Sequence, residues 1–132
     1  MLQVCCAIIQ KEDKFLICQR SETMKLALKW EFPGGKLQIG ESKQQGLKRE
    51  IKEELGVEIK ILNQLSMVEH HYSDFSINLY PFLCYIHTGD LKIIEHAQAQ
   101  WVTIDNLKLY NWAAADLPIV EELEKLFPIK KQ

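Results

Sequence analysis

The chain has little net charge, few cysteines and no long apolar run. Its 132 residues carry a formal net charge of −2, so no basic excess would attract nucleic acid or an acidic membrane. The first apolar segment, residues 2–10, is too short to cross a bilayer and lacks the basic start and cleavage site of a signal peptide. We therefore expect a cytoplasmic protein whose partners include neither polymeric nucleic acid nor a membrane.

Metal ligands of the soft type are also scarce. The chain has four cysteines, Cys5, Cys6, Cys18 and Cys84. No two of them form a Cys-x-x-Cys pair, so a zinc site is not indicated. We expect reduced thiols, mostly in the core of an intracellular protein. His70 and His71 are neighbours and would point to opposite faces of a strand, so we expect neither to bind a metal.

Apolar and β-branched segments predict several strands within one domain spanning residues 1–132. A hairpin is expected from two segments that flank a polar turn, residues 2–10 and 14–20. Residues 21–30 are expected as a loop, and Phe-Pro-Gly-Gly at 32–35 as a turn. Three further strands are expected over residues 57–70, 75–87 and 99–104.

Two helices are predicted in addition. A Ser-x-x-Gln capping box at 42–45 and a glycine at Gly56 bound a helix over about residues 43–55. A second amphipathic helix is expected over residues 116–127, with four apolar residues on one side: Leu117, Val120, Leu123 and Phe127. The mixture of strands and helices favours an α/β fold with a sheet covered by helices.

The first helix carries a cluster of carboxylates. Glu50, Glu53 and Glu54 recur at i, i+3 and i+4, which places them together on one face, where like charges repel. One interpretation is a solvent-exposed charged face, but such faces usually alternate in sign. Hard oxygen ligands beside a glycine-rich turn instead predict a Mg²⁺ site for phosphate chemistry.

Residues 35–57 resemble the Nudix box, G-x5-E-x7-R-E-U-x-E-E-x-G-U, where U is a bulky aliphatic residue. Every specified position is filled, from Gly35 and Glu41 to the run Arg49–Val57. The segment "WEFPGGK" at 30–36 is similar to the MutT-like subgroup. This resemblance implies the Nudix fold, a mixed sheet between helices in an α/β/α sandwich. It also implies hydrolysis of a nucleoside diphosphate linked to another group, with Mg²⁺ as cofactor and Mn²⁺ as a possible substitute.

The same resemblance implies roles for individual residues. The matches to the family's metal ligands are the Gly34 carbonyl and the carboxylates of Glu50, Glu53 and Glu54. Arg49 and Glu41 match an ion pair that orients this cluster, while Gly35 and Gly56 have structural roles.

Glu95 occupies the place of a further glutamate near the metals in MutT-like enzymes, although an exposed loop glutamate is the alternative. The general base that accepts a proton from water is Glu50, Glu53 or Glu95, and the resemblance does not choose among them.

Four residues are candidates for substrate binding. Arg20 matches an arginine that contacts phosphate in MutT-like enzymes, with a surface arginine as the alternative. Asp116 is placed to cap the second helix, and it also lies where the CTP pyrophosphohydrolase subgroup has an Asp and 8-oxo-dGTP enzymes have an Asn. An ionised Asp accepts from the amino group of cytosine, and equally from purine N–H groups. Phe32 and Phe75 are the candidates for stacking on the base.

The predicted function is hydrolysis of a nucleoside triphosphate to the monophosphate and pyrophosphate, by a monomer or homodimer. CTP, dCTP or oxidised nucleotides such as 8-oxo-dGTP are the expected substrates, the latter linking the chain to DNA repair. One alternative is a Nudix hydrolase of ADP-ribose, a dinucleoside polyphosphate or a sugar nucleotide. Another is a catalytically silent nucleotide-binding module, although no box glutamate is missing here. Processing of RNA 5′ ends is disfavoured because the chain lacks a basic stripe.

Overall fold

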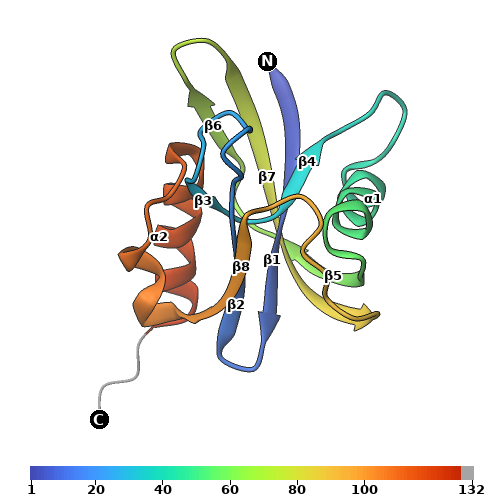
Figure 1. Ribbon diagram of the computed structural model, residues 1–132, viewed down its shortest axis with the longest axis vertical. Coiled ribbons are helices and arrows are strands. Elements are labelled where there is room, and N and C mark those ends of the chain that lie inside the picture. Colours follow the sequence, from blue (N-terminus) through green and yellow to red (C-terminus); the bar gives the residue numbers. More distant parts are fainter. Residues whose placement is uncertain (129–132) are drawn as a thin grey trace.

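The computed structural model describes residues 1–128 and shows a central sheet with one helix on each side (Figure 1). Its eight strands are, in chain order, β1 (Leu2–Lys11), β2 (Lys14–Gln19), β3 (Trp30–Glu31), β4 (Gly34–Lys36), β5 (Glu58–Gln64), β6 (Val68–His71), β7 (Ser76–Thr88) and β8 (Gln98–Thr103). The helices are α1 (Lys43–Leu55), α2 (Leu117–Leu126) and two 3₁₀ segments, η1 (Ile104–Leu109) and η2 (Ala114–Asp116). The mixed sheet between helices that we expected is therefore confirmed.

The strand order β3-β2-β1-β7-β5 makes β1 and β7 the centre of the sheet. These two strands run parallel, from the pair Leu2 and Ile77 to the pair Ile9 and Cys84. The expected hairpin is present, because β1 and β2 pair antiparallel. Off this path, β4 pairs with β1, β6 with β7, and β8 with β2.

Alternation along β1 divides the core into two layers, one under each helix. Cys5 and Ile9 pack with the α1 side of the sheet, whereas Cys6 and Ile8 pack with the α2 side. The four cysteines are free and buried, as expected. The α1 stripe Leu47, Ile51 and Leu55 is fully buried, and each such side chain stabilises the fold by about 1.5–3 kcal/mol.

Both ends of α1 follow the sequence signals. The Ser42 hydroxyl accepts from the Gln45 amide, the Gln45 side chain accepts from the Ser42 amide, and Gly56 ends the helix at φ 71°. A left-handed residue at this place favours glycine because glycine has no Cβ. Among residues 1–128, no helix is long and apolar enough to cross a membrane.

The single strand expected over residues 57–70 is wrong, because two strands, β5 and β6, occupy it. Both pair with β7, β5 with its second half and β6 with its first. Between them the Ser66 amide and hydroxyl both donate to the Glu122 carboxylate of α2 at 3.0 Å. Ser66 is thus bonded to α2 rather than to β7, and this contact with a distant segment has no local signal in the sequence.

Two other expectations need correction. Residues 32–35 do not form a simple turn: the chain bends at Pro33, and Gly34 then begins the strand β4, which pairs with β1. In α2 the buried residues are Ile119, Val120 and Leu123, while Leu117 is 46% exposed. Leu117 therefore lies outside the buried face of α2.

Candidate active site

The strand β4 holds two glycines against the carboxylates of α1. A Cβ on Gly34 would overlap the Cys5 carbonyl, and a Cβ on Gly35 would overlap the Glu50 carboxylate. Glycine is therefore required here for close approach, rather than for a turn. This close approach lets two glutamates from α1, Glu50 and Glu54, reach the backbone of β4.

Glu54 is the most buried of these carboxylates, with 6% of its surface exposed. Its Oε2 accepts a hydrogen bond from the Gly34 amide at 3.2 Å. Burial above all, and then the charges of Glu31, Glu50 and Glu95, raise the pKa of Glu54 to about 9. Glu54 thus lies in an environment with an excess of negative charge.

Arg49 holds the rest of the cluster in place. Its guanidinium donates to Glu41 Oε1 at 2.7 Å and Oε2 at 3.1 Å, and to Glu50 Oε1 at 2.9 Å. A longer contact of 3.4 Å reaches Glu53, whose side chain is 53% exposed. Hydrogen bonding to Arg49 lowers the pKa of Glu41, whereas burial raises the pKa of Glu50. The expected ion pair between Arg49 and Glu41 is present.

The donor set fits a hard divalent cation. Buried carboxylate oxygens with few N–H donors and unmatched charge are the ligands that Mg²⁺ prefers. Glu50 and Glu54 lie together against the β4 glycines, while Glu53 is turned toward Arg49. Within residues 1–128, no three His, Cys, Asp or Glu side chains are already placed to hold one metal ion. The full ligand set therefore stays a prediction.

A cavity of about 490 Å³ opens beside this cluster, within the range of small-molecule sites. Its walls include all four residues expected to bind substrate: Arg20, Phe32, Phe75 and Asp116. Gly34, Gly35, Glu54 and Glu95 line the same cavity. Residues separated by up to 96 positions in the chain are thus brought to one place by the sheet.

Asp116 does not cap α2, contrary to one expectation. Its Oδ2 instead accepts from the Phe32 amide at 2.9 Å, and the helix has no side-chain cap. Because Asp116 lies in η2 with helical backbone angles, its side chain turns toward the sheet rather than toward the α2 amides. Burial, and next the charge of Glu31, raise the pKa of this carboxyl well above its usual value.

Two further residues of the cavity, Glu31 and His96, did not emerge from the sequence. Glu31 Oε1 accepts from Arg20 Nη1 at 2.8 Å, and its Oε2 lies 2.8 Å from His96 Nε2. The His96 ring is 1% exposed, and its Nδ1 has no hydrogen-bond partner among the described residues. The only sequence signal was the position of Glu31 beside the Phe-Pro-Gly-Gly segment.

The aromatic candidates are held by neighbouring rings. Phe32 stacks on Trp112 with centroids 4.9 Å apart and is 2% exposed, so it forms a wall of the cavity. Phe75 stacks on Tyr72 at 4.8 Å and is only partly buried. The Tyr72 hydroxyl accepts from the Ala115 amide at 2.9 Å, which ties this pair to the segment before α2.

Residues 4–122 match the family model described as the NUDIX domain, so the chain belongs to the Nudix family. The family resemblance seen in the box is confirmed, and so is its class: the chain is a hydrolase.

Two proteins of Escherichia coli K12 are similar to this chain over most of its length. Over 121 residues it is 34% identical to a protein named CTP pyrophosphohydrolase from Escherichia coli K12, covering 92% of this chain and 90% of that protein. Over 126 residues it is 29% identical to the 8-oxo-dGTP diphosphatase of the same strain, covering 95% and 98%.

Solved structures show the same likeness. The solution structure of the E. coli ORF135 protein matches with a TM-score of 0.81 and 32% identity, covering 98% of this chain and 95% of that one. MutT from methicillin-resistant Staphylococcus aureus 252 matches with a TM-score of 0.77 and 35% identity, covering 95% and 96%.

Proposed function

We propose that this chain hydrolyses a nucleoside triphosphate to the monophosphate and pyrophosphate, with Mg²⁺, or Mn²⁺ in its place, as cofactor. The observation that carries the proposal is that one cavity joins Arg20 and Asp116 to Glu54 and Glu95. Groups suited to a phosphate and a base thus adjoin groups suited to a divalent cation. The names of the two E. coli relatives support cytidine or oxidised guanine nucleotides as substrates.

Side chains of the protein have separate roles in the proposed reaction. Arg20 donates to phosphate oxygens through Nη2, which has no partner among the described residues, while Nη1 stays on Glu31. Arg49 fixes Glu50 on the face of α1. A carboxylate, Glu50, Glu53 or Glu95, accepts the proton of the attacking water.

Mg²⁺ would be held by the Gly34 carbonyl together with the four carboxylates Glu50, Glu53, Glu54 and Glu95. When bound, it offsets the charge of the phosphate oxygens and lowers the pKa of bound water.

Asp116 is the residue that reads the base. Burial raises the pKa of Asp116 and so favours its protonated form, in which the carboxyl has both a donor and an acceptor. Its Oδ2 is already engaged by the Phe32 amide, which leaves the other oxygen for the ligand. A protonated oxygen donates to the O6 of an oxidised guanine. An ionised one accepts from the cytosine amino group instead. This dual capacity supports a relaxed substrate set.

The test is pyrophosphate release with Mg²⁺ and with EDTA, measured for seven substrates: CTP, dCTP, 5-methyl-dCTP, 8-oxo-dGTP, dGTP, ATP and ADP-ribose. Mg²⁺-dependent release from the cytidine or 8-oxo substrates is expected. Activity on ADP-ribose alone would overturn the substrate class and keep the family. Absence of turnover across the panel would favour a nucleotide-binding module.

We further propose that the protein acts in the cytoplasm as a monomer or homodimer. Its four buried free thiols suit a reducing compartment. Size-exclusion chromatography with light scattering would measure the oligomeric state, and a larger assembly would contradict this part of the proposal.

A further inference from the structure

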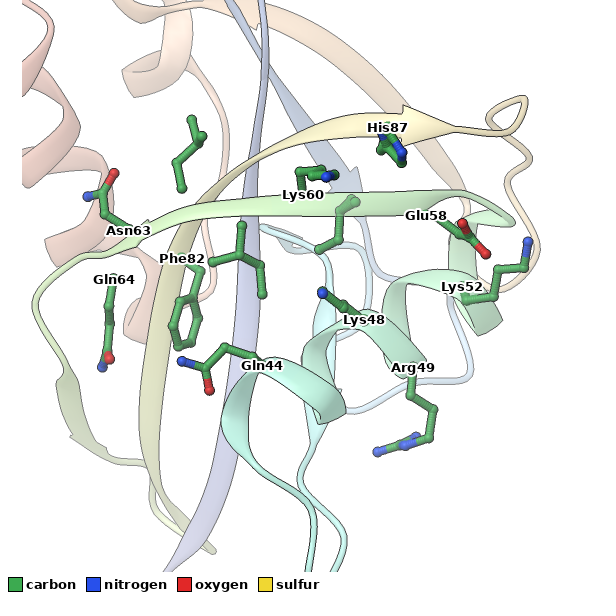
Figure 2. A pocket seen from close by; sticks show the side chains of 13 residues that line it. Gln44, Lys48, Arg49, Lys52, Glu58, Lys60, Asn63, Gln64, Phe82 and His87 are labelled. Atoms are coloured by element: carbon green, nitrogen blue, oxygen red, sulfur yellow. The ribbon is translucent and has the colours of Figure 1, made fainter.

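Two cavities of the protein differ in how firmly their polar groups are held. One, of about 800 Å³, lies between α1 and the edge strand β5 and shares no lining residue with the cavity beside the glutamate cluster (Figure 2). Three polar side chains that α1 presents there, Gln44, Lys48 and Lys52, are exposed and make no hydrogen bond within residues 1–128, so they are not held in one orientation. The cavity beside the glutamate cluster, in contrast, contains a polar group that is held in place and has no role so far, the hydroxyl of Tyr72.

Tyr72 is held at the turn between β6 and β7. Its amide donates to the Phe75 carbonyl at 2.8 Å. Its ring stacks on Phe75 and makes a T-shaped contact with His70, with centroids 4.8 Å and 4.4 Å apart. Its hydroxyl accepts from the Ala115 amide of η2 at 2.9 Å. The backbone, the ring and the hydroxyl are thus all fixed before a ligand binds.

The contact with Ala115 uses this hydroxyl only as an acceptor. A phenol also has one O–H donor, and this donor bonds to no residue of the described part of the chain. Burial raises the pKa of Tyr72, and the charge of Asp116 acts in the same direction, so the phenol keeps its proton at neutral pH. A buried amide such as that of Ala115 needs an acceptor, which accounts for the Tyr72 oxygen but not for its hydrogen.

The free donor lies close to the residue that we propose reads the base. Ala115, which holds the hydroxyl, directly precedes Asp116, and both residues line the cavity together with Tyr72. The Phe32 amide occupies one Asp116 oxygen and leaves the other for a ligand. An ionised Asp116 thus offers an acceptor near the donor of Tyr72. Cytosine has the complementary pair, because its N4 amino group donates and the neighbouring ring nitrogen N3 accepts.

We propose that Tyr72 is a second base-binding residue, whose hydroxyl donates to N3 of cytosine while Asp116 accepts from the N4 amino group. This inference deepens the proposed function and rests on it, because it takes a cytidine nucleotide as the ligand. Two bonds to neighbouring atoms of one edge fix the orientation of the base as well as its affinity. Uracil has an N–H at position 3 and a carbonyl oxygen in place of the amino group, so it presents the opposite pattern to these two residues.

The test is calorimetric titration of the Mg²⁺-loaded protein with CMP and with 3-deaza-CMP, in which a C–H replaces the N3 acceptor. The wild type should bind CMP about fivefold or more tightly than 3-deaza-CMP, the effect of one hydrogen bond. In Tyr72→Phe the two ligands should bind with equal affinity, because only the hydroxyl is lost. The matched control Tyr80→Phe removes a hydroxyl outside the cavity, which donates to Gln3 at 2.6 Å, and should keep the wild-type preference.

The ratio of the two affinities separates base binding from a structural role. If the hydroxyl only holds the Ala115 amide, Tyr72→Phe will weaken both ligands equally and keep the wild-type ratio, which would overturn the proposal. Equal affinities in the wild type would also overturn it, and that measurement stands even if the variant loses its fold. Absence of saturable CMP binding would have the same meaning. Because the titration involves no turnover, failure of the proposed function appears only in the pyrophosphate assay, and either result can occur without the other.

Discussion

His96 Nε2 lies 2.8 Å from Glu31 Oε2, and this contact joins two sides of the catalytic cavity. The Glu31 carboxylate accepts from Arg20 through its other oxygen. With an ionised Glu31 as acceptor, Nε2 must carry the hydrogen. Within residues 89–97, His96 alone is buried, and this segment carries Glu95. His96 thus ties the segment that carries Glu95 to β3, whose Glu31 also binds Arg20.

We therefore predict that His96→Ala raises KM and lowers kcat for the nucleotide substrate, by about tenfold in kcat/KM. The change leaves a partly buried carboxylate oxygen without its donor, which costs about 1–3 kcal/mol. His96→Gln retains an N–H donor and should recover part of the loss. Steady-state kinetics on the three proteins checks this. The control is Ile94→Ala, an exposed neighbour, and equal kinetics for all variants would refute the role of His96.

A second prediction concerns the carboxylates of α1. Glu53→Gln and Glu54→Gln should each lower kcat by orders of magnitude at saturating Mg²⁺, because each removes a charged oxygen ligand. Both proteins should remain folded, since the amide occupies nearly the same volume. Circular dichroism and turnover assays measure the two effects. Glu121→Gln, an exposed change on α2, serves as the control, and near-normal activity in both site variants would contradict the assignment.

The sequence predicted the elements whose signals are local. The α1 helix has a capping box at Ser42, an apolar stripe and a terminal glycine at Gly56, and all three appear in the structure. The box also placed the glutamates beside the glycines, because residues 35–57 form one continuous strand-and-helix unit. Local periodicity and a contiguous motif were sufficient there.

Contacts between distant segments could not be predicted. The bonds from Ser66 to Glu122 lie where one expected strand is interrupted, and the bond from Phe32 to Asp116 is present in place of an expected cap. No local signal marks His96 as buried, because its partner Glu31 is 65 positions away in the sequence. Each of these interactions depends on how the strands pair in the sheet, which local sequence patterns do not determine.

The third prediction is a pH dependence of stability in the metal-free protein. Burial and neighbouring carboxylates raise the pKa of Glu54 from 4.5 to about 9. The folded state therefore retains a proton that the unfolded state releases, so this contribution is largest near pH 4.5 and is lost as pH rises toward 9. Burial acts in the same direction on the pKa of Asp116.

Urea denaturation in EDTA between pH 5 and pH 9 should show a falling free energy of unfolding. Glu54→Gln cannot ionise, and its profile should be flatter than that of the wild type. Mg²⁺ displaces the proton, so its affinity should increase with pH over the same interval. Stability that rises with pH across this interval in EDTA would show that Glu54 is ionised in the folded protein.

The last prediction tests how the base is read. In Asp116→Asn the amide has a fixed donor and acceptor and cannot ionise, so it should keep the pairing available to a protonated Asp116 and lose that of the carboxylate. We expect the ratio of kcat/KM for CTP to that for 8-oxo-dGTP to fall by about tenfold, within the 1–3 kcal/mol of one base contact. Asp116→Ala leaves the Phe32 amide without its acceptor and should reduce both activities. The exposed change Asp105→Asn on η1 is the control. An unchanged ratio in Asp116→Asn would show that another residue reads the base.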